Sequence, residues 1–343
     1  MSTDEFFMSR AIEVARLADA AVFPNPYVGA VIVHQSKIIA EGYHQKFGNP
    51  HAEVHAVNQV KNPDILKECS IYVTLEPCAH HGKTPPCADL LVKHQFKRVV
   101  VGSVDPFAKV NGAGIERMKN AGIEVTVGVL KSQCDTLNKR FFTFHQKKRP
   151  YITLKWAESV DGYLAPKNQI QGERTKITGA LSHLLVHQQR SNEHAILVGR
   201  KTVENDNPEL NVRHLVAPSP IRFVIDPKLK LTEDYKIFQG GLPTHVLNLV
   251  EDSQKNNITF HKLTELSPAS ICEKLFELGI LSVYIEGGAH TIQQFIHAGL
   301  WDQIYRFIGP TKLLSGIEAP KFEGVLIDKK SIEQDELQWI EPA

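Results

Sequence analysis

The strongest constraint on the fold lies between His51 and Cys87, where one histidine and two cysteines are spaced to bind a single metal ion. Cys78 and Cys87 each follow a proline, and Glu53 stands two residues after the histidine. One histidine and two cysteines form a ligand set for zinc, and three protein ligands leave a fourth coordination position open for water. An open position is typical of a catalytic zinc site. We therefore expect the chain to fold so that these three side chains meet.

Glu53 is placed to move protons rather than to bind the metal. Zinc lowers the pKa of a bound water from about 15.7 to about 7, so that hydroxide becomes available at neutral pH. A neighbouring carboxylate can take the proton and pass it to a leaving amine. The pattern His-x-Glu followed by Pro-Cys is part of the signature of zinc nucleobase deaminases, in which two residues separate the cysteines. Here eight residues separate Cys78 from Cys87.

Other interpretations of the same residues stay open at this point. The three predicted ligands could instead be a buried histidine and two inert buried thiols. His51 and His55 are spaced as in H-E-x-x-H metalloproteases, but there the glutamate directly follows the first histidine, and Ala52 does so here. A zinc-stabilised binding module without catalysis would have no use for Glu53 or for an open coordination position.

The length of 343 residues is enough for two domains. A polar, basic stretch at 146–150, Gln-Lys-Lys-Arg-Pro, interrupts the alternation of strand and helix patterns and predicts a boundary. We place the first domain at 1–147 and the second at 150–343. The sequence patterns of both halves predict α/β domains.

In the first half, apolar patterns predict a strand at 28–33 with 37–41 as its hairpin partner, and further strands at 71–75, 98–102 and 123–127. Helices are expected at 4–20, after 52, and at 85–94, 114–120 and 131–145. Strands that alternate with helices predict a three-layer domain with a mainly parallel sheet. In the second half, strands are expected at 151–157, 194–199, 220–226, 244–249, 281–286 and 303–308, with helices at 181–191 and 289–298. Gly287 and Gly288 stand at a strand–helix junction suited to an anion, although the G-x-G-x-x-G turn of a Rossmann unit is missing.

Charge and cysteine usage exclude several classes of protein. The net charge is about +1, which gives no electrostatic reason to expect nucleic acid or an anionic membrane as partner. The five cysteines are an odd and sparse set, which fits a reducing compartment better than a disulfide framework. The acidic start of the chain predicts no signal peptide, and no apolar run is long enough for a transmembrane helix. We expect a cytoplasmic protein.

Long motifs in both halves resemble a known family. In the first half they are Pro24-Asn25-Pro26-x-Val28-Gly29-Ala30, His51-Ala52-Glu53-Val54-His55-Ala56, Tyr72-Val73-Thr74-Leu75-Glu76-Pro77-Cys78 and His80-x-Gly82-Lys83-Thr84-Pro85-Pro86-Cys87. In the second half they are Thr153-Leu154-Lys155-x-Ala157-x-Ser159-x-Asp161-Gly162, Gly199-x-x-Thr202-Val203-x-x-Asp206-Asn207-Pro208 and Glu286-Gly287-Gly288. Over essentially its whole length the sequence resembles the bifunctional deaminase/reductases of riboflavin biosynthesis. The long loop between the cysteines is this family's own version.

The resemblance implies a cytidine-deaminase-like N-terminal domain and a dihydrofolate-reductase-like C-terminal domain. The first would deaminate 2,5-diamino-6-(5-phosphoribosylamino)pyrimidin-4(3H)-one with zinc, and the second would reduce the ribosyl side chain of the product to ribityl with NADPH. The implied partners are small phosphorylated pyrimidines and further copies of the same chain, associated through the reductase domain.

The resemblance also assigns site residues. The metal ligands would be His51, Cys78 and Cys87, with Glu53 as the catalytic residue. Deaminase substrate contacts would be Asn25, His44, Lys83, Thr84 and Asp105. NADPH contacts would be Ala157, Lys176, Thr202, Asp206, Gly288, Ala289, His290 and Thr291. Reductase substrate contacts would be Lys155, Arg174, Arg190, Leu210, Arg213 and Glu286, with the arginines on the phosphate.

The sequence departs from the family pattern near residue 172. Arg174 stands where the family usually has a serine, and Lys176 where it has a tryptophan; we expect Arg174 to contact the substrate phosphate and Lys176 to attract cofactor phosphates. Phe107 replaces a polar residue and is assigned no ligand contact. The main alternative function is a zinc deaminase of nucleosides or tRNA with an unrelated second domain, which would need a short Cys-x-x-Cys loop and, for tRNA, a basic face.

Overall fold

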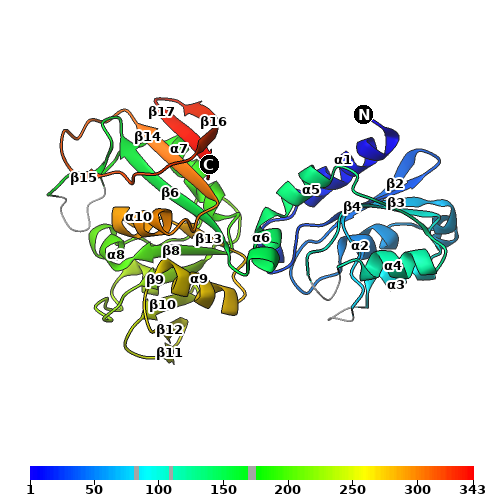
Figure 1. Ribbon diagram of the computed structural model, residues 1–343, viewed down its shortest axis with the longest axis horizontal. Helices are drawn as coiled ribbons and strands as arrows, with labels where there is room; N and C mark the ends of the chain where they lie inside the picture. Colours follow the sequence, from blue (N-terminus) through cyan, green and yellow to red (C-terminus); the bar gives the residue numbers. More distant parts are fainter. Residues whose placement is uncertain (81–84, 108–110, 169–174) are drawn as a thin grey trace. The chain divides into compact units, whose positions relative to one another are not determined.

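The computed structural model describes residues 1–80, 85–107, 111–168 and 175–343 (Figure 1). The chain divides into two compact units, Met1–Lys147 and Lys148–Ala343. Each unit has its own sheet and its own hydrophobic core. We call them the N-terminal unit and the C-terminal unit and describe each by itself.

The N-terminal unit alternates helices with short strands. Its strands are β1 (Gly29–His34), β2 (Lys37–Tyr43), β3 (Ser70–Leu75), β4 (Arg98–Ser103) and β5 (Glu124–Val127). Its α-helices are α1 (Thr3–Ala15), α2 (Ala52–Asn58), α3 (Cys87–Lys93), α4 (Ala113–Asn120), α5 (Lys131–Leu137) and α6 (Lys139–Lys147), and short 3₁₀ helices span Ala20–Val22 and Pro63–Glu68.

The sheet of this unit has the order β2-β1-β3-β4-β5 and is mixed. Strand β1 pairs antiparallel with both β2 and β3, whereas β3, β4 and β5 run parallel. The hairpin expected between 28–33 and 37–41 is confirmed, and the antiparallel pairing of β1 with β3 is the departure from a mainly parallel sheet. The turn of this hairpin is tight: Gln35 and Ser36 have φ of 47° and 60°, the left-handed pair that matches the twist of two-residue hairpins.

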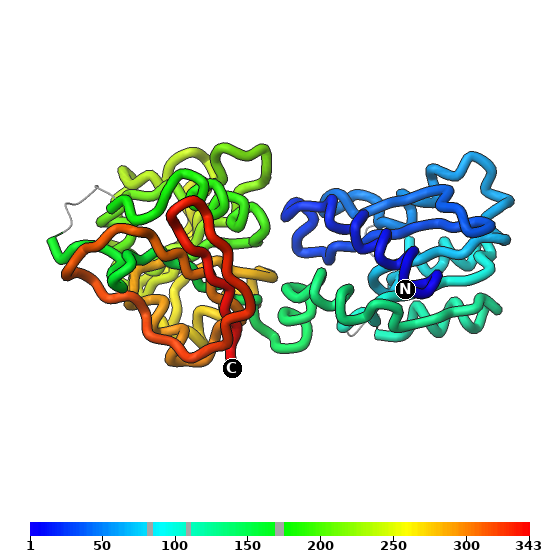
Figure 2. Tube along the Cα trace, turned by 90° about the horizontal axis from the view of Figure 1, so that it is seen from above, coloured from blue at the N-terminus to red at the C-terminus, as the bar shows by residue number. Residues whose placement is uncertain are grey.

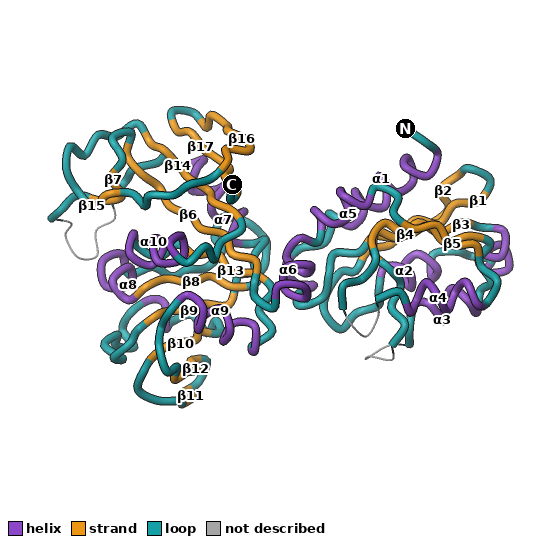
Figure 3. The backbone as a smooth tube through the Cα atoms, in the orientation of Figure 1, coloured by secondary structure: helices purple, strands orange, loops and turns teal. Residues whose placement is uncertain are grey.

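Helices cover both faces of this sheet, as Figure 3 shows, which confirms the three-layer prediction. Alternate residues of β1 point to opposite faces. Val31 and Val33 pack with apolar residues of α1 and with Cys134 of α5, whereas Ala30 and Ile32 pack with α2, α3 and α4. An apolar layer therefore covers each face of the sheet. Polar residues lie at the ends of its strands.

Two helix predictions in this unit need correction. The first helix ends at Ala15 rather than near residue 20, and Ser2 is its N-cap, in a capping box with Glu5. The single helix predicted over 131–145 is broken into α5 and α6 at Asn138. The Asn138 side chain accepts a hydrogen bond from the Tyr27 backbone N–H and donates one to the Tyr27 carbonyl, both at 2.8 Å.

The C-terminal unit has more strands. They are β6 (Tyr151–Ser159), β7 (Tyr163–Ala165), β8 (Ala195–Gly199), β9 (Ile221–Ile225), β10 (Thr244–Asn248), β11 (Ser253–Lys255), β12 (Ile258–Lys262), β13 (Ser282–Ile285), β14 (Gln303–Gly309), β15 (Ile317–Glu318), β16 (Val325–Ile332) and β17 (Asp335–Glu341). The α-helices are α7 (Ala180–Arg190), α8 (Arg200–Asp206), α9 (Pro268–Glu277) and α10 (Ala289–His297), and a 3₁₀ helix spans Lys236–Phe238.

The large sheet of this unit has the order β11-β12-β10-β9-β8-β13-β6-β14-β17-β16. Its centre, from β12 to β14, is parallel, and antiparallel strands close both edges. Strands β16 and β17 form the terminal hairpin, which is red in Figure 2. Because the central strands are parallel, their carboxyl ends lie along one edge, where ligands gather in α/β sheets.

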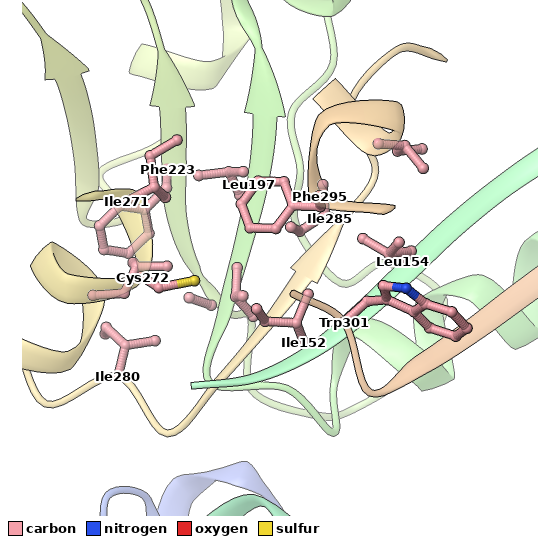
Figure 4. Close-up of a cluster of buried hydrophobic side chains, with 14 of the residues drawn as sticks. Ile152, Leu154, Leu197, Phe223, Ile271, Cys272, Ile280, Ile285, Phe295 and Trp301 are labelled. Atoms are coloured by element: carbon pink, nitrogen blue, oxygen red, sulfur yellow. The ribbon is translucent and has the colours of Figure 1, made fainter. Parts of the chain in front are cut away.

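A large apolar cluster fills one face of this sheet, and Figure 4 shows it at close range. Leu154, Leu197 and Ile285 of three central strands pack there with Phe295 of α10 and Ile271 of α9. The other face carries smaller clusters that include Val186 of α7 and Val203 of α8. Buried strands with apolar residues on both faces are typical of a sheet covered by helices on each side.

Candidate functional site

The three predicted metal ligands meet in the N-terminal unit. His51 is the N-cap residue of α2, Cys78 follows the end of β3, and Cys87 is the first residue of α3. His51 Nδ1 lies 3.6 Å from Cys78 Sγ and 3.3 Å from Cys87 Sγ. Among the described residues these three side chains form a group whose ligand atoms all lie within 4.8 Å of one another.

The spacing of these atoms fits a tetrahedral zinc ion. With zinc–sulfur bonds of about 2.3 Å and zinc–nitrogen bonds of about 2.0–2.1 Å, tetrahedral angles place sulfur and nitrogen about 3.6 Å apart. The site also stabilises negative charge on sulfur: hydrogen bonds from the Cys87 side chain, from His51 and from the Cys87 backbone N–H lower the pKa of Cys78 to about 4. Thiolate is the form that binds zinc. The donor set and its geometry therefore suit the metal.

Glu53 lies beside this group without belonging to it. It is in the first turn of α2, is only 3% exposed, and forms a hydrogen bond with the Cys87 side chain. Burial raises the pKa of its carboxyl group. A carboxyl group with a raised pKa, adjacent to an open coordination position, is suited to accepting and returning a proton.

Asn25 and His44, two predicted substrate contacts, lie together next to the ligand group. Asn25 Nδ2 donates a hydrogen bond to His44 Nε2 at 3.0 Å, and His44 Nδ1 donates one to the Pro50 carbonyl at 3.1 Å. Burial lowers the pKa of His44, which favours the neutral imidazole. The ring of His44 stands edge-on to the ring of His51, with 5.4 Å between centroids. This pair forms one polar wall of the site.

Asp105 forms a second polar group near Cys78. Its side chain is buried, which raises the pKa of its carboxyl group to about 7, and it accepts a hydrogen bond from the Phe107 backbone N–H at 2.8 Å. Lys83 and Thr84, the other predicted contacts of the deaminase substrate, lie outside the described residues.

Glu76 was not assigned a role from the sequence, yet its carboxylate organises this edge of the sheet. It accepts hydrogen bonds from the backbone N–H groups of Asp105, Gly112, Gly114 and Ile115, at 3.2, 2.9, 3.0 and 3.3 Å. It thereby ties the loop after β4 and the start of α4 to the end of β3. The available signal was a carboxylate at the carboxyl end of a strand, immediately before Pro77 and Cys78.

In the C-terminal unit, three of the predicted substrate contacts form one ionic cluster. Arg190 holds Glu286 through two hydrogen bonds, Nε to Oε1 at 2.5 Å and Nη2 to Oε2 at 2.8 Å. Lys155 Nζ lies 3.8 Å from the same carboxylate and 5.6 Å from the ring centroid of Phe307. Burial alone would raise the pKa of Glu286, but the charges of Arg190 and Lys155 lower it to about 2.

The predicted cofactor contacts gather at two neighbouring strand–helix junctions. Gly288 N donates a hydrogen bond to Thr202 Oγ1 at 2.8 Å, which links the start of α10 to α8. A Cβ on Gly287 would lie 2.9 Å from Gly199 N, so this approach requires glycine. Ala289, His290 and Thr291 form the first turn of α10, where unpaired N–H groups and the helix dipole favour phosphate.

The remaining predicted contacts are more dispersed. Asp206 is the last residue of α8, Ala157 lies on β6 against the cluster around Phe307, and Lys176 is exposed. Leu210 is buried, and Arg213 forms an ion pair with Glu209 at 3.0 Å. Arg174 lies outside the described residues.

Comparisons with known proteins agree with this arrangement. A model of the cytidine and deoxycytidylate deaminase zinc-binding region matches residues 1–103, and a model of the RibD C-terminal domain matches residues 150–340. The riboflavin biosynthesis protein RibD of Aquifex aeolicus is 38% identical over 343 residues, which cover 96% of this chain and 95% of the relative. The chain belongs to the RibD family. RibD of Escherichia coli is 37% identical, over 91% of this chain and 88% of its own length.

Solved RibD structures have the same fold. RibD of Acinetobacter baumannii superposes with a TM-score of 0.91 at 33% identity, covering 99% of each chain. The diaminohydroxyphosphoribosylaminopyrimidine deaminase/5-amino-6-(5-phosphoribosylamino)uracil reductase of Thermotoga maritima superposes with a TM-score of 0.90 at 34% identity, again over 99% of each chain. The expected combination of a cytidine-deaminase-like domain and a reductase domain is confirmed.

Membership of the RibD family settles the class of protein. It is a bifunctional enzyme of riboflavin biosynthesis, a deaminase and a reductase, with zinc and NADPH as cofactors. The match of residues 150–340 excludes the alternative in which a nucleoside or tRNA deaminase carries an unrelated second domain. Within the described residues, no helix is both long enough and apolar enough to span a membrane.

Proposed function

We propose that the N-terminal unit carries the deaminase site and the C-terminal unit the reductase site. The deaminase would hold zinc on His51, Cys78 and Cys87, and it would act on 2,5-diamino-6-(5-phosphoribosylamino)pyrimidin-4(3H)-one. The observation that carries this proposal is the meeting of these three ligands beside the buried carboxyl group of Glu53. Zinc, when bound, supplies a water that is activated at neutral pH.

In this proposal Glu53 performs the proton transfers. Its carboxylate accepts a proton from the attacking water and passes it to the ring nitrogen, then carries the second proton from the new hydroxyl to the exocyclic amine, which leaves as ammonia while the oxygen stays on the ring carbon as a carbonyl. Asn25 and His44 would orient the ring from one side, and Asp105 from another. Because burial raises the pKa of Asp105 to about 7, its carboxyl group can donate a hydrogen bond near neutral pH.

For the reductase, we assign the phosphate of the substrate to Arg213 and Arg190, and its polar side chain to Lys155 and Glu286. NADPH supplies the hydride that converts the ribosyl group to ribityl. The turn from Gly288 to Thr291, with Thr202 and Asp206, would bind the cofactor, and Ala157 and Lys176 would contact it. The cluster of Lys155, Arg190 and Glu286 supports this assignment, since an arginine already oriented by a carboxylate binds a ligand with less loss of entropy.

Two further proposals concern the cellular compartment and the oligomeric state of the protein. Five free cysteines support a reducing, cytoplasmic compartment. Edge strand β16 exposes Val325, Leu326 and Ile327, and no other described strand pairs with its outer edge, which supports a homo-oligomer that associates through the C-terminal unit. Light scattering should give a multiple of 38.4 kDa, and substituting Leu326 with lysine should shift the mass towards the single chain.

The direct test of the deaminase site is Glu53→Gln. Removal of a general acid–base group should lower ammonia release by roughly 10²–10⁴-fold while zinc content stays at one ion per chain. Glu13→Gln, which changes an exposed carboxylate paired with Arg10, is the matched control and should have no effect. Unchanged ammonia release in the Glu53 variant would refute the assignment.

A further inference from the structure

The segment 209–213, between α8 and β9, is held at its backbone by buried side chains from other elements. Arg222 Nη1 of β9 donates a hydrogen bond to the Glu209 carbonyl at 3.2 Å. Arg190 Nη1 of α7 donates one to the Asn211 carbonyl at 3.1 Å. A segment tied in this way from a strand and a helix is fixed relative to the sheet.

The third side chain that fixes this segment is His187 of α7. Its Nδ1 accepts a hydrogen bond from the backbone N–H of Arg213 at 3.1 Å. His187 is only 6% exposed, and it lies one helical turn before Arg190, on the same side of α7. Burial, together with the charges of Arg190 and Arg213, lowers the pKa of His187 to about 4. Its imidazole is therefore neutral, with Nδ1 free to accept.

The backbone of this segment adopts conformations that require such stabilising contacts. Leu210 has a φ of 52° and His214 a φ of 67°, both in the left-handed region that residues with a side chain rarely adopt. Conformations of this kind cost free energy and persist only where the surroundings impose them. The local sequence alone would not hold Arg213 in this place.

We infer that His187 is a positioning residue of the reductase: it fixes the backbone of Arg213 so that the guanidinium group faces the substrate phosphate. This inference rests on the proposed function, in which Arg213 binds that phosphate. The Arg213 guanidinium group is partly exposed and forms an ion pair with Glu209, which lies on the same short segment. The position of the guanidinium group therefore follows the position of this segment's backbone. His187 acts through Arg213 and not on the substrate itself.

The test compares three variants of the full chain in NADPH oxidation with the deaminated, phosphorylated pyrimidine as substrate. His187→Leu removes the acceptor at similar size, and His187→Asn keeps an acceptor at the same position along the side chain. His194→Leu is the matched control: His194 Nδ1 also accepts a backbone N–H, that of Leu281, at 3.2 Å, but this contact lies where β8 and β13 begin.

We expect His187→Leu to raise the KM for this substrate roughly tenfold with little change in kcat, because the lost contact supports binding in both ground and transition states. His187→Asn should restore most of the affinity, and His194→Leu should leave KM unchanged. In an Arg213→Ala background the effect of His187→Leu should vanish, because the two changes act on one interaction. Ammonia release should be the same in all variants.

Three results would overturn the inference: an unchanged KM in His187→Leu, an equal rise in His194→Leu, or a His187 effect that persists without the Arg213 side chain. If His187→Leu does not fold, His187→Gln, which displaces the acceptor but keeps the side chain polar, replaces it with the same expected direction. A wild-type chain that does not oxidise NADPH would refute the proposed reductase function instead, so the two failures are distinguishable.

Discussion

At the scale of single residues, Glu76 explains how the polar edge of the N-terminal sheet keeps its shape. Its two carboxylate oxygens accept from four backbone N–H groups that come from the loop after β4 and from the start of α4. The sequence placed this glutamate at a strand end. Its partners, however, lie 29 to 39 positions further along the chain, which spacing alone could not reveal.

Glu76→Gln should therefore lower the free energy of unfolding of the N-terminal unit by about 1–3 kcal/mol, because an amide N–H₂ would face backbone donors that need an acceptor. Urea denaturation measures the change. Glu116→Gln, on the exposed surface of α4, serves as the control and should stay within about 0.5 kcal/mol of wild type. If the Glu76 variant is as stable as wild type, the carboxylate does not hold this edge together.

Glu286 gives a prediction about pH. Its pKa of about 2 in the folded chain lies below its value of about 4.3 in an unfolded chain, so the ionised pair with Arg190 contributes stability above pH 4.3. That contribution is lost as pH falls towards 2. The difference in unfolding free energy between wild type and Glu286→Gln should be constant from pH 7 to about 5 and should shrink below about 4.3. If the difference in unfolding free energy is the same at pH 6 and pH 3.5, the ionised pair of Glu286 and Arg190 does not stabilise the folded chain.

At the scale of elements, the fully buried strands could be predicted and the exposed edge strand β16 could not. Strands such as β4 and β8 are short runs of β-branched and aliphatic residues buried on both faces, and their positions follow from the sequence within a residue or two. Strand β16 is exposed over seven of its eight residues and mixes Val325 and Leu326 with Asp328 and Lys329, so it has no periodicity to detect. Helix α9 was also not predicted.

The break between α5 and α6 shows a tertiary contact that overrides helical propensity. Residues 131–145 read as one helix, but the Asn138 side chain pairs with both backbone groups of Tyr27, more than a hundred positions earlier. Asn138→Ala should reduce the stability of the N-terminal unit by about 1–3 kcal/mol, since two partly buried backbone groups lose their partners. Thermal unfolding of this variant and of Asn138→Asp tests the idea.

The aspartate variant is the informative one. It keeps the acceptor for the Tyr27 N–H and loses only the donor to the carbonyl, so its stability should fall between wild type and alanine. An alanine variant that unfolds at the wild-type temperature would mean that the break has another cause.

At the scale of the whole molecule, the proposed metal group could be predicted from the sequence because each proposed ligand lies in a distinctive local motif. The histidine and the two Pro-flanked cysteines meet as expected, and Glu53 lies beside them. The proposed reductase site was harder to predict, because its cluster joins β6, α7 and the end of β13, and arginines and glutamates are common on surfaces. Only the fold shows that Arg190 and Glu286 hold each other, and that His187 and Arg222 support the segment with Arg213.

Metal removal distinguishes the two activities, which we have assigned to separate units. Because we place zinc only at the N-terminal site, a chelator should stop ammonia release and leave the C-terminal site intact. Readdition of zinc should restore ammonia release, provided that His51, Cys78 and Cys87 are unchanged. Loss of the apo protein through unfolding is monitored by circular dichroism in the same samples.

The most direct test follows ammonia and NADPH together, with the diaminopyrimidine phosphate or its deaminated product as substrate, before and after chelation. We predict that the untreated enzyme releases ammonia from the diamino substrate without NADPH and oxidises one NADPH per ammonia when the cofactor is present. After chelation, ammonia release should cease, while NADPH oxidation with the deaminated substrate should continue at the original rate. Loss of that NADPH oxidation in a folded, zinc-free chain, or ammonia release that survives chelation, would contradict the assignment of two independent sites.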